Sequence, residues 1–103
     1  MTNSTENFLQ ILESTIADRL ENSSQESYTA NLAASGTKRV AQKVGEEAVE
    51  LALASVAGDR AEVLNEAADL VYHLLVLLTH HEMSLTDVVS ELEARHREAA
   101  SLV

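Results

Sequence analysis

The feature that most constrains the fold is one tight turn, at Gly58 and Asp59, between two long stretches of helix-forming residues. The sequence has no proline and only three glycines, so few positions can interrupt a helix. Gly58 is typical of a helix end, and Asp59 with Glu62 is typical of a helix start. We therefore predict helices over about 37–57 and 60–81, and the short connection makes them antiparallel neighbours.

Apolar spacing and capping residues predict the remaining helices. Helical spacing of apolar residues indicates a first helix over about 6–21. After a polar break, a short helix over 28–34 ends before Gly36, and Thr37 is a candidate N-cap for the long helix that follows. A capping signature that begins at Ser84 marks the start of a last helix with a single apolar stripe.

These elements predict a single all-α domain over residues 1–103, folded as an antiparallel four-helix bundle. The helix over about 60–81 is apolar around nearly its whole circumference, because Leu70, Val71 and the run 74–78 leave little polar surface. Such a helix must be buried on every side, which a chain of 103 residues can hardly achieve alone. We therefore expect a homodimer or a higher homo-oligomer.

Composition excludes several classes of function. The formal net charge of −10 argues against nucleic-acid binding, although divalent cations can still join an acidic site to an anionic small molecule. No cysteine is present, which excludes a disulfide framework and a thiolate metal site. The opening MTNSTENF lacks the features of a signal peptide, and the longest apolar run, 70–78, is too short to span a bilayer. We expect a cytoplasmic protein without a membrane partner.

Four carboxylates are placed symmetrically about Gly58. Glu50 and Glu66 lie equally far from it along the chain, and so do Glu47 and Asp69. In an antiparallel helix pair, the two members of each pair lie at the same level along the helix axes. Four acidic side chains at matched levels repel one another strongly unless a cation lies between them. The arrangement predicts a metal site made by these four residues.

The ligand type indicates the metal and the class of reaction. Carboxylate oxygens without His or Cys favour Mg²⁺, with Mn²⁺ possible, over zinc. Such an ion can polarise a phosphoryl oxygen and orient a water, so we expect hydrolysis of a phosphoanhydride. The simpler explanation of one acidic pair is a solvated helix face, with Lys43 neutralising Glu47. Two pairs at equal depth on adjacent helices favour the metal.

These residues also resemble a known family. The segments EEAVE at 46–50 and EAAD at 66–69 match the EExxE…ExxD signature of the all-α, MazG-type nucleotide pyrophosphohydrolases. KVGEEAVELALA and NEAADLVYHLLVLL resemble, more narrowly, the phosphoribosyl-ATP pyrophosphohydrolases of histidine biosynthesis. SYTANLAASGTKRVAQ and LTDVVSELEARH are similar to further segments of that family, so the resemblance covers about 27–96.

The resemblance implies hydrolysis of 1-(5-phosphoribosyl)-ATP between its α and β phosphates. The products would be 1-(5-phosphoribosyl)-AMP and pyrophosphate, in the second step of L-histidine biosynthesis. It also implies that Glu47, Glu50, Glu66 and Asp69 ligate Mg²⁺ and that Glu46, Glu47 and Glu50 are catalytic. Glu46 would be a further ligand, a support for a ligand, or the carboxylate that orients the attacking water.

Lys38, Arg39 and Lys43 concentrate positive charge just before the acidic motif. We expect them to hold substrate phosphates. The simpler explanation is helix solubility together with ion pairs to the neighbouring glutamates. Asn31 occupies a position where the resemblance leads us to expect Lys, so one basic contact is missing here.

Tyr28 and His73 complete the expected substrate-binding residues. His73 lies one helical turn after Asp69, so it can bond that carboxylate, contact substrate, or be satisfied within the core. Tyr28 belongs to the SYT segment and either reaches the substrate or anchors the short helix.

Two other functions fit the same residues. One is a MazG-like pyrophosphohydrolase that acts on (deoxy)nucleoside triphosphates. The other is a non-catalytic helical dimerisation module with a merely solvated acidic face. The SYTANL and DLVYHLL segments favour phosphoribosyl-ATP over other nucleotides, and metal dependence separates an enzyme from a dimerisation module.

Overall fold

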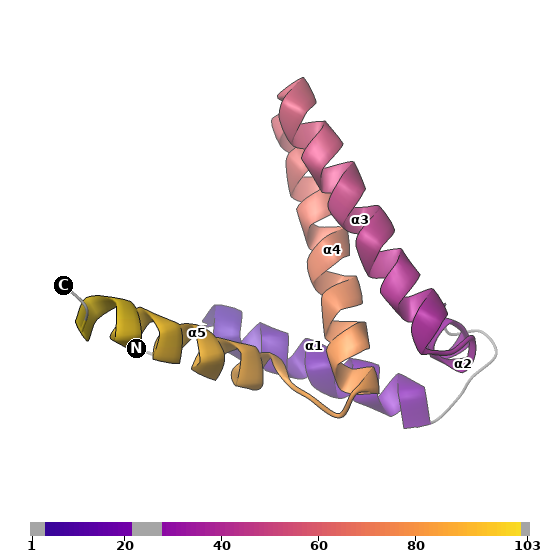
Figure 1. Ribbon diagram of the computed structural model, residues 1–103. Helices are drawn as coiled ribbons and strands as arrows, with labels where there is room; N and C mark the ends of the chain where they lie inside the picture. The colour runs from indigo at the N-terminus through magenta and orange to yellow at the C-terminus, as the bar shows by residue number, and fades with distance from the viewer. Residues whose placement is uncertain (1–3, 22–27, 102–103) are drawn as a thin grey trace.

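A computed structural model describes residues 4–21 and 28–101, and these ranges contain helices and no strand. The polar break expected at 22–27 lies outside the described residues. The helices are α1 (Ser4–Glu21), α2 (Tyr28–Ala34), α3 (Thr37–Ala57), α4 (Arg60–His80) and α5 (Leu85–Ser101). Figure 1 shows α3 and α4 side by side as a long antiparallel hairpin, with α1 crossing its base and α5 leading away from it. The all-α prediction is confirmed.

The turn between α3 and α4 has the predicted capping geometry. Gly58 has φ 76° and ψ 18°, a left-handed conformation that glycine adopts without a steric penalty. Its N–H lies 3.1 Å from the carbonyl oxygen of Ala54 and 3.2 Å from that of Ser55. The Asp59 side chain accepts a hydrogen bond of 3.2 Å from the backbone N–H of Glu62. The direction of the chain therefore reverses within two residues, between the end of α3 and the start of α4.

The start of α3 differs from the prediction. Gly36, with φ 99°, is the N-cap, and Thr37 is the first helical residue. The Thr37 hydroxyl lies 2.7 Å from Nε2 of His80, at the far end of α4. The prediction that Thr37 caps α3 is wrong, because its side chain links the two arms of the hairpin instead.

The start of α5 is capped twice. The backbone N–H of Ser84 donates to the Asp87 carboxylate over 2.9 Å, and the N–H of Asp87 donates to the Ser84 hydroxyl over 3.3 Å. The N–H of Leu85 donates to the carboxylate of Glu13, on α1, over 2.7 Å. The predicted capping signature at Ser84 is confirmed, and the contact with Glu13 attaches α5 to α1.

The buried core lies at the base of the hairpin. It is formed by side chains from α1, α2, α3 and α4: Ile16, Leu32, Val40, Leu75 and Val76. Towards the tip of the hairpin, apolar side chains face solvent, and Val56 is 89% and Leu64 73% exposed. No helix in the described ranges is long and apolar enough to cross a membrane.

Candidate active site

Three of the four predicted metal ligands converge in the middle of the hairpin. Glu47 comes from α3, and Glu66 and Asp69 come from successive turns of α4. One carboxylate oxygen from each residue lies within 4.8 Å of the other two. Residues three apart share a helix face, so Glu66 and Asp69 can face Glu47 together.

The burial of these carboxylates fits a cation-binding role. Glu47 is only 4% exposed. Its Oε2 and the Oε2 of Glu66 are buried without a hydrogen-bond partner among the described residues. A buried, unsatisfied carboxylate oxygen is costly, and a divalent cation would supply a partner for both of these oxygens. The all-oxygen set of ligands suits Mg²⁺ or Mn²⁺.

Glu50, the fourth predicted ligand, lies outside this group of three but contacts one of its members. A hydrogen bond between the Glu50 and Glu66 side chains raises the pKa of Glu66 from its usual 4.5 to about 7, assisted by desolvation and by the charges of Glu50, Glu47 and Asp69. A carboxyl group with a raised pKa carries less negative charge near neutral pH, which lowers the repulsion within the cluster.

Lys43 borders the cluster on α3. Its Nζ lies 3.2 Å from the Glu47 carboxylate, and this bond raises the pKa of Lys43. The ion pair that we weighed as the simpler explanation of Lys43 is therefore present. It places an ammonium group at the edge of the acidic cluster, while Lys38 is exposed on the first turn of α3.

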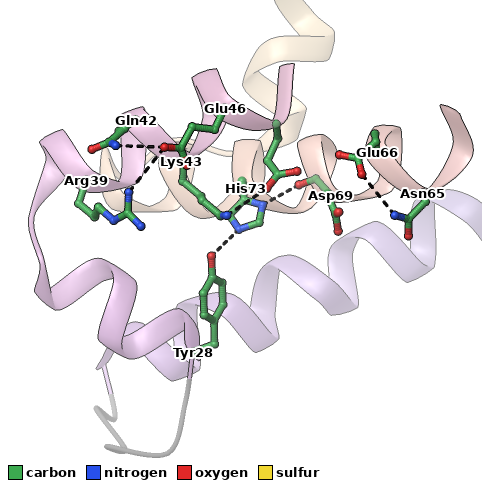
Figure 2. A network of polar contacts seen from close by, with 10 residues as sticks. Tyr28, Arg39, Gln42, Lys43, Glu46, Asn65, Glu66, Asp69 and His73 are labelled. Atoms are coloured by element: carbon green, nitrogen blue, oxygen red, sulfur yellow. Dashed lines mark hydrogen bonds and ion pairs between the residues drawn. The ribbon is translucent and has the colours of Figure 1, made fainter. Parts of the chain in front are cut away.

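Glu46 has separate partners, shown in Figure 2. Its Oε2 accepts a hydrogen bond of 3.1 Å from Gln42 and lies 4.0 Å from the guanidinium of Arg39. Glu46 and Arg39 are both about half exposed, so this contact adds little stability. The structure thus brings Glu46 next to Arg39 rather than into the group formed by Glu47, Glu66 and Asp69.

His73 is 6% exposed, and both of its ring nitrogens have partners. Nδ1 lies 2.7 Å from the backbone carbonyl oxygen of Asp69, and Nε2 lies 2.8 Å from the hydroxyl of Tyr28 (Figure 2). A carbonyl oxygen only accepts, so Nδ1 carries the hydrogen of that bond, while Nε2 and the Tyr28 hydroxyl share the other bond. Of the three roles weighed for His73, the structure shows a histidine satisfied within the core, and its bond on the Asp69 side goes to the backbone rather than to the carboxylate.

The model of the phosphoribosyl-ATP pyrophosphohydrolase family matches residues 9–96. The chain belongs to this family. The matched range contains every residue predicted above for the site, from Tyr28 to His73.

Curated relatives named "Histidine biosynthesis bifunctional protein HisIE" are similar to the chain. The protein from Salmonella typhi is 56% identical over 90 residues, which cover 87% of this chain and 44% of the relative. The one from Photobacterium profundum is 54% identical over 89 residues, covering 86% and 43%. The one from Shewanella oneidensis is 54% identical over 92 residues, covering 89% and 44%. The chain spans less than half the length of these relatives.

Some polar contacts around the acidic cluster and α2 of this pyrophosphohydrolase-family chain were not expected from the sequence. Asn65 donates to the carboxylates of Glu62 and Glu66, each over 3.4 Å. Thr29, which is 1% exposed, shares a hydrogen bond with the Tyr72 hydroxyl. The only signal for these residues was their position, since Asn65 directly precedes a predicted ligand and Thr29 lies in the SYT segment.

Proposed function

We propose that this chain is a Mg²⁺-dependent phosphoribosyl-ATP diphosphatase. It hydrolyses 1-(5-phosphoribosyl)-ATP between the α and β phosphates to 1-(5-phosphoribosyl)-AMP and pyrophosphate, the second step of L-histidine biosynthesis. The observation that carries the proposal is the convergence of Glu47, Glu66 and Asp69 in a chain of this family. The names of the relatives, which are histidine-biosynthesis proteins, agree with it.

In this proposal, Glu47, Glu50, Glu66 and Asp69 hold the metal ion, with Mn²⁺ able to replace Mg²⁺. The ion, when bound, would polarise a phosphoryl oxygen and neutralise charge on the phosphates. The unpartnered oxygens of Glu47 and Glu66 support this, and so does the raised pKa of Glu66, because a bound cation would relieve the same crowding of negative charge.

The carboxylates of α3 also act on the attacking water. We propose Glu46, Glu47 and Glu50 as the catalytic carboxylates, with Glu46 as the candidate that orients this water and accepts its proton, which is the task of a general base. Glu46 supports this assignment because it directly adjoins Glu47 and keeps a side chain that is 44% exposed.

Basic and aromatic side chains at the base of the hairpin bind the substrate. Lys38, Arg39 and Lys43 hold its phosphates. Lys43 lies beside the acidic cluster because it forms an ion pair with Glu47. Tyr28 is 52% exposed, which leaves its ring open to substrate, while its hydroxyl is bonded to His73. Contact between His73 and substrate stays a prediction.

The expected homodimer and four-helix bundle belong to the same proposal. The Cα radius of gyration is 15.8 Å, larger than the roughly 13 Å expected for a compact domain of this size. Exposed apolar side chains also lie along the hairpin: Val49, Leu53, Val56, Leu64 and Val71. A second copy packed against the hairpin would bury such side chains and complete a bundle. We further propose a cytoplasmic protein that binds neither nucleic acid nor membranes.

The proposal is tested by incubating the protein with phosphoribosyl-ATP and with a panel of (deoxy)nucleoside triphosphates, with and without Mg²⁺. We expect pyrophosphate from phosphoribosyl-ATP only when Mg²⁺ is present. Release of orthophosphate would contradict cleavage at the α–β bond. Comparable hydrolysis of the other nucleotides would support the MazG-like alternative. No hydrolysis and no Mg²⁺ binding would support a non-catalytic module.

A further inference from the structure

The first two residues of α2 each form a hydrogen bond with one of two consecutive residues of α4. The Tyr28 hydroxyl bonds Nε2 of His73 over 2.8 Å, and the Thr29 hydroxyl bonds that of Tyr72. α2 has only seven residues, and a helix of this length is not stable by itself in water. These two contacts therefore help to fix α2 against the hairpin.

Only the Tyr28 contact continues to the acidic cluster. His73 links Tyr28 to Asp69, because its Nδ1–H donates to the carbonyl oxygen of Asp69 over 2.7 Å. The Thr29 contact instead leads through Tyr72 to α1, where Arg19 lies 3.4 Å from the Tyr72 hydroxyl. The described residues thus contain two series of hydrogen bonds that start from α2. One runs through His73 to Asp69, a predicted metal ligand, and the other runs through Tyr72 to Arg19.

The imidazole of His73 is held firmly between its neighbours. The rings of Tyr28 and Tyr72 stand nearly perpendicular to it, at 88° and 84°, with centroids 5.7 and 5.6 Å away. With a bond at each nitrogen and an aromatic ring on two sides, rotation of His73 would break at least one hydrogen bond. His73 therefore joins α2 rigidly to the turn of α4 that carries Asp69.

We propose that Tyr28 and His73 are positioning residues that hold Asp69 in its place in the acidic cluster. Repulsion among Glu47, Glu66 and Asp69 pushes these side chains apart when no cation is bound. The hydrogen bond from Nδ1 of His73 to the Asp69 carbonyl oxygen fixes the backbone from which that carboxylate extends. A ligand held in position before binding lowers the cost of assembling the site. The role rests on the proposed metal site.

The test compares two variants that each remove one tyrosine hydroxyl from the α2–α4 contact. Tyr28→Phe breaks the connection that leads to Asp69, and Tyr72→Phe breaks the one that does not. Mg²⁺ affinity is measured by calorimetry on the full chain, alongside helical content by circular dichroism and KM for phosphoribosyl-ATP. We expect Tyr28→Phe to weaken Mg²⁺ binding by about tenfold, the lower end of the effect of groups that support metal ligands. Tyr72→Phe should leave it unchanged.

Variants of His73 give an independent measurement. His73→Leu removes both bonds, whereas His73→Asn keeps an N–H donor close to the position of Nδ1. We expect His73→Asn to bind Mg²⁺ more tightly than His73→Leu. The Tyr28→Phe and His73→Leu double variant should bind it no more weakly than His73→Leu alone, because one connection cannot be broken twice.

Three outcomes would overturn the proposal. One is wild-type Mg²⁺ affinity in both Tyr28→Phe and His73→Leu. Another is an equal loss in Tyr72→Phe, which would indicate a general effect of loosening α2. The third is a raised KM for phosphoribosyl-ATP in Tyr28→Phe with unchanged Mg²⁺ affinity, which would make the Tyr28 hydroxyl a substrate contact. If the wild-type chain itself binds no Mg²⁺, the proposed metal site fails, and this inference fails with it.

Discussion

Two sets of carboxylates in this chain have opposite surroundings. One set accepts hydrogen bonds from backbone N–H groups at helix starts: Glu13, Asp59 and Asp87. In the other set, Glu47 and Glu66 each keep a buried oxygen with no partner among the described residues. A carboxylate that accepts from a backbone donor stabilises the helix that it caps, whereas clustered carboxylates with unpartnered buried oxygens destabilise the metal-free fold, although Lys43 pairs with Glu47 and Asn65 donates to Glu66. The difference indicates which acidic residues serve the fold and which serve a cation.

The largest expected effect comes from neutralising the second set. Asp69→Asn or Glu66→Gln should lower hydrolysis of phosphoribosyl-ATP by about 100-fold or more, because a metal ion contributes several kcal/mol to stabilising the transition state. The same changes should leave the metal-free melting temperature unchanged or raise it, since they remove repulsion. Steady-state kinetics and thermal unfolding measure the two effects. Glu91→Gln is the matched control, because Glu91 pairs with Arg95 on α5. Full activity in Asp69→Asn would contradict the assignment of the second set of carboxylates to a cation.

Removing a capping carboxylate should have the opposite pattern. Asp59→Ala deletes the acceptor for the N–H of Glu62 and should lower the free energy of unfolding by about 1 kcal/mol. Mg²⁺ affinity should be unchanged, because Asp59 lies at the tip of the hairpin, two turns from Glu66. Chemical denaturation with and without Mg²⁺ checks both. A large loss of Mg²⁺ affinity would mean that the cap and the site are not separate.

The smallest effect is a dependence of stability on pH. The pKa of Glu66 is raised from 4.5 to about 7, so between these values the folded chain keeps a proton that the unfolded chain has lost. This contribution to stability is present below pH 4.5 and is lost as the pH rises through about 7. Melting temperatures of wild type and Glu66→Gln are measured from pH 4 to 8 without metal. The difference between the two pH profiles gives the contribution of Glu66 to stability. Saturating Mg²⁺ should instead raise the melting temperature of the wild type above that of Glu66→Gln, because Glu66 is a proposed ligand. Identical pH profiles without metal would rule out the raised pKa.

The hairpin and its acidic cluster could be predicted from the sequence because they depend on local signals. Gly58 and Asp59 define the turn, and the three-residue spacing of Glu66 and Asp69 defines a helix face. The bond between Thr37 and His80 could not be predicted, because it joins residues 43 positions apart and displaced the expected cap.

The partners of His73 show the same limit within the site. Helical spacing correctly placed His73 beside Asp69, but it does not distinguish the carboxylate from the backbone carbonyl. That choice depends on Tyr28, 45 positions away, which fixes the other side of the ring. The crossing of α1 over the hairpin base likewise depends on distant contacts, such as that between Arg19 and the Tyr72 hydroxyl, 53 positions apart. The four-helix bundle and the homodimer stay predictions.

The tight turn between α3 and α4 also has a consequence for chain length. It sets the angular phase of one helix relative to the other, so the count of residues between Glu50 and Glu66 decides which carboxylates meet. One residue inserted between Gly58 and Glu66 would shift the rest of α4 by about 1.5 Å and rotate it by about 100°. The hairpin could still form, but Glu66 and Asp69 would no longer face Glu47. This segment can therefore accept substitutions more readily than insertions or deletions.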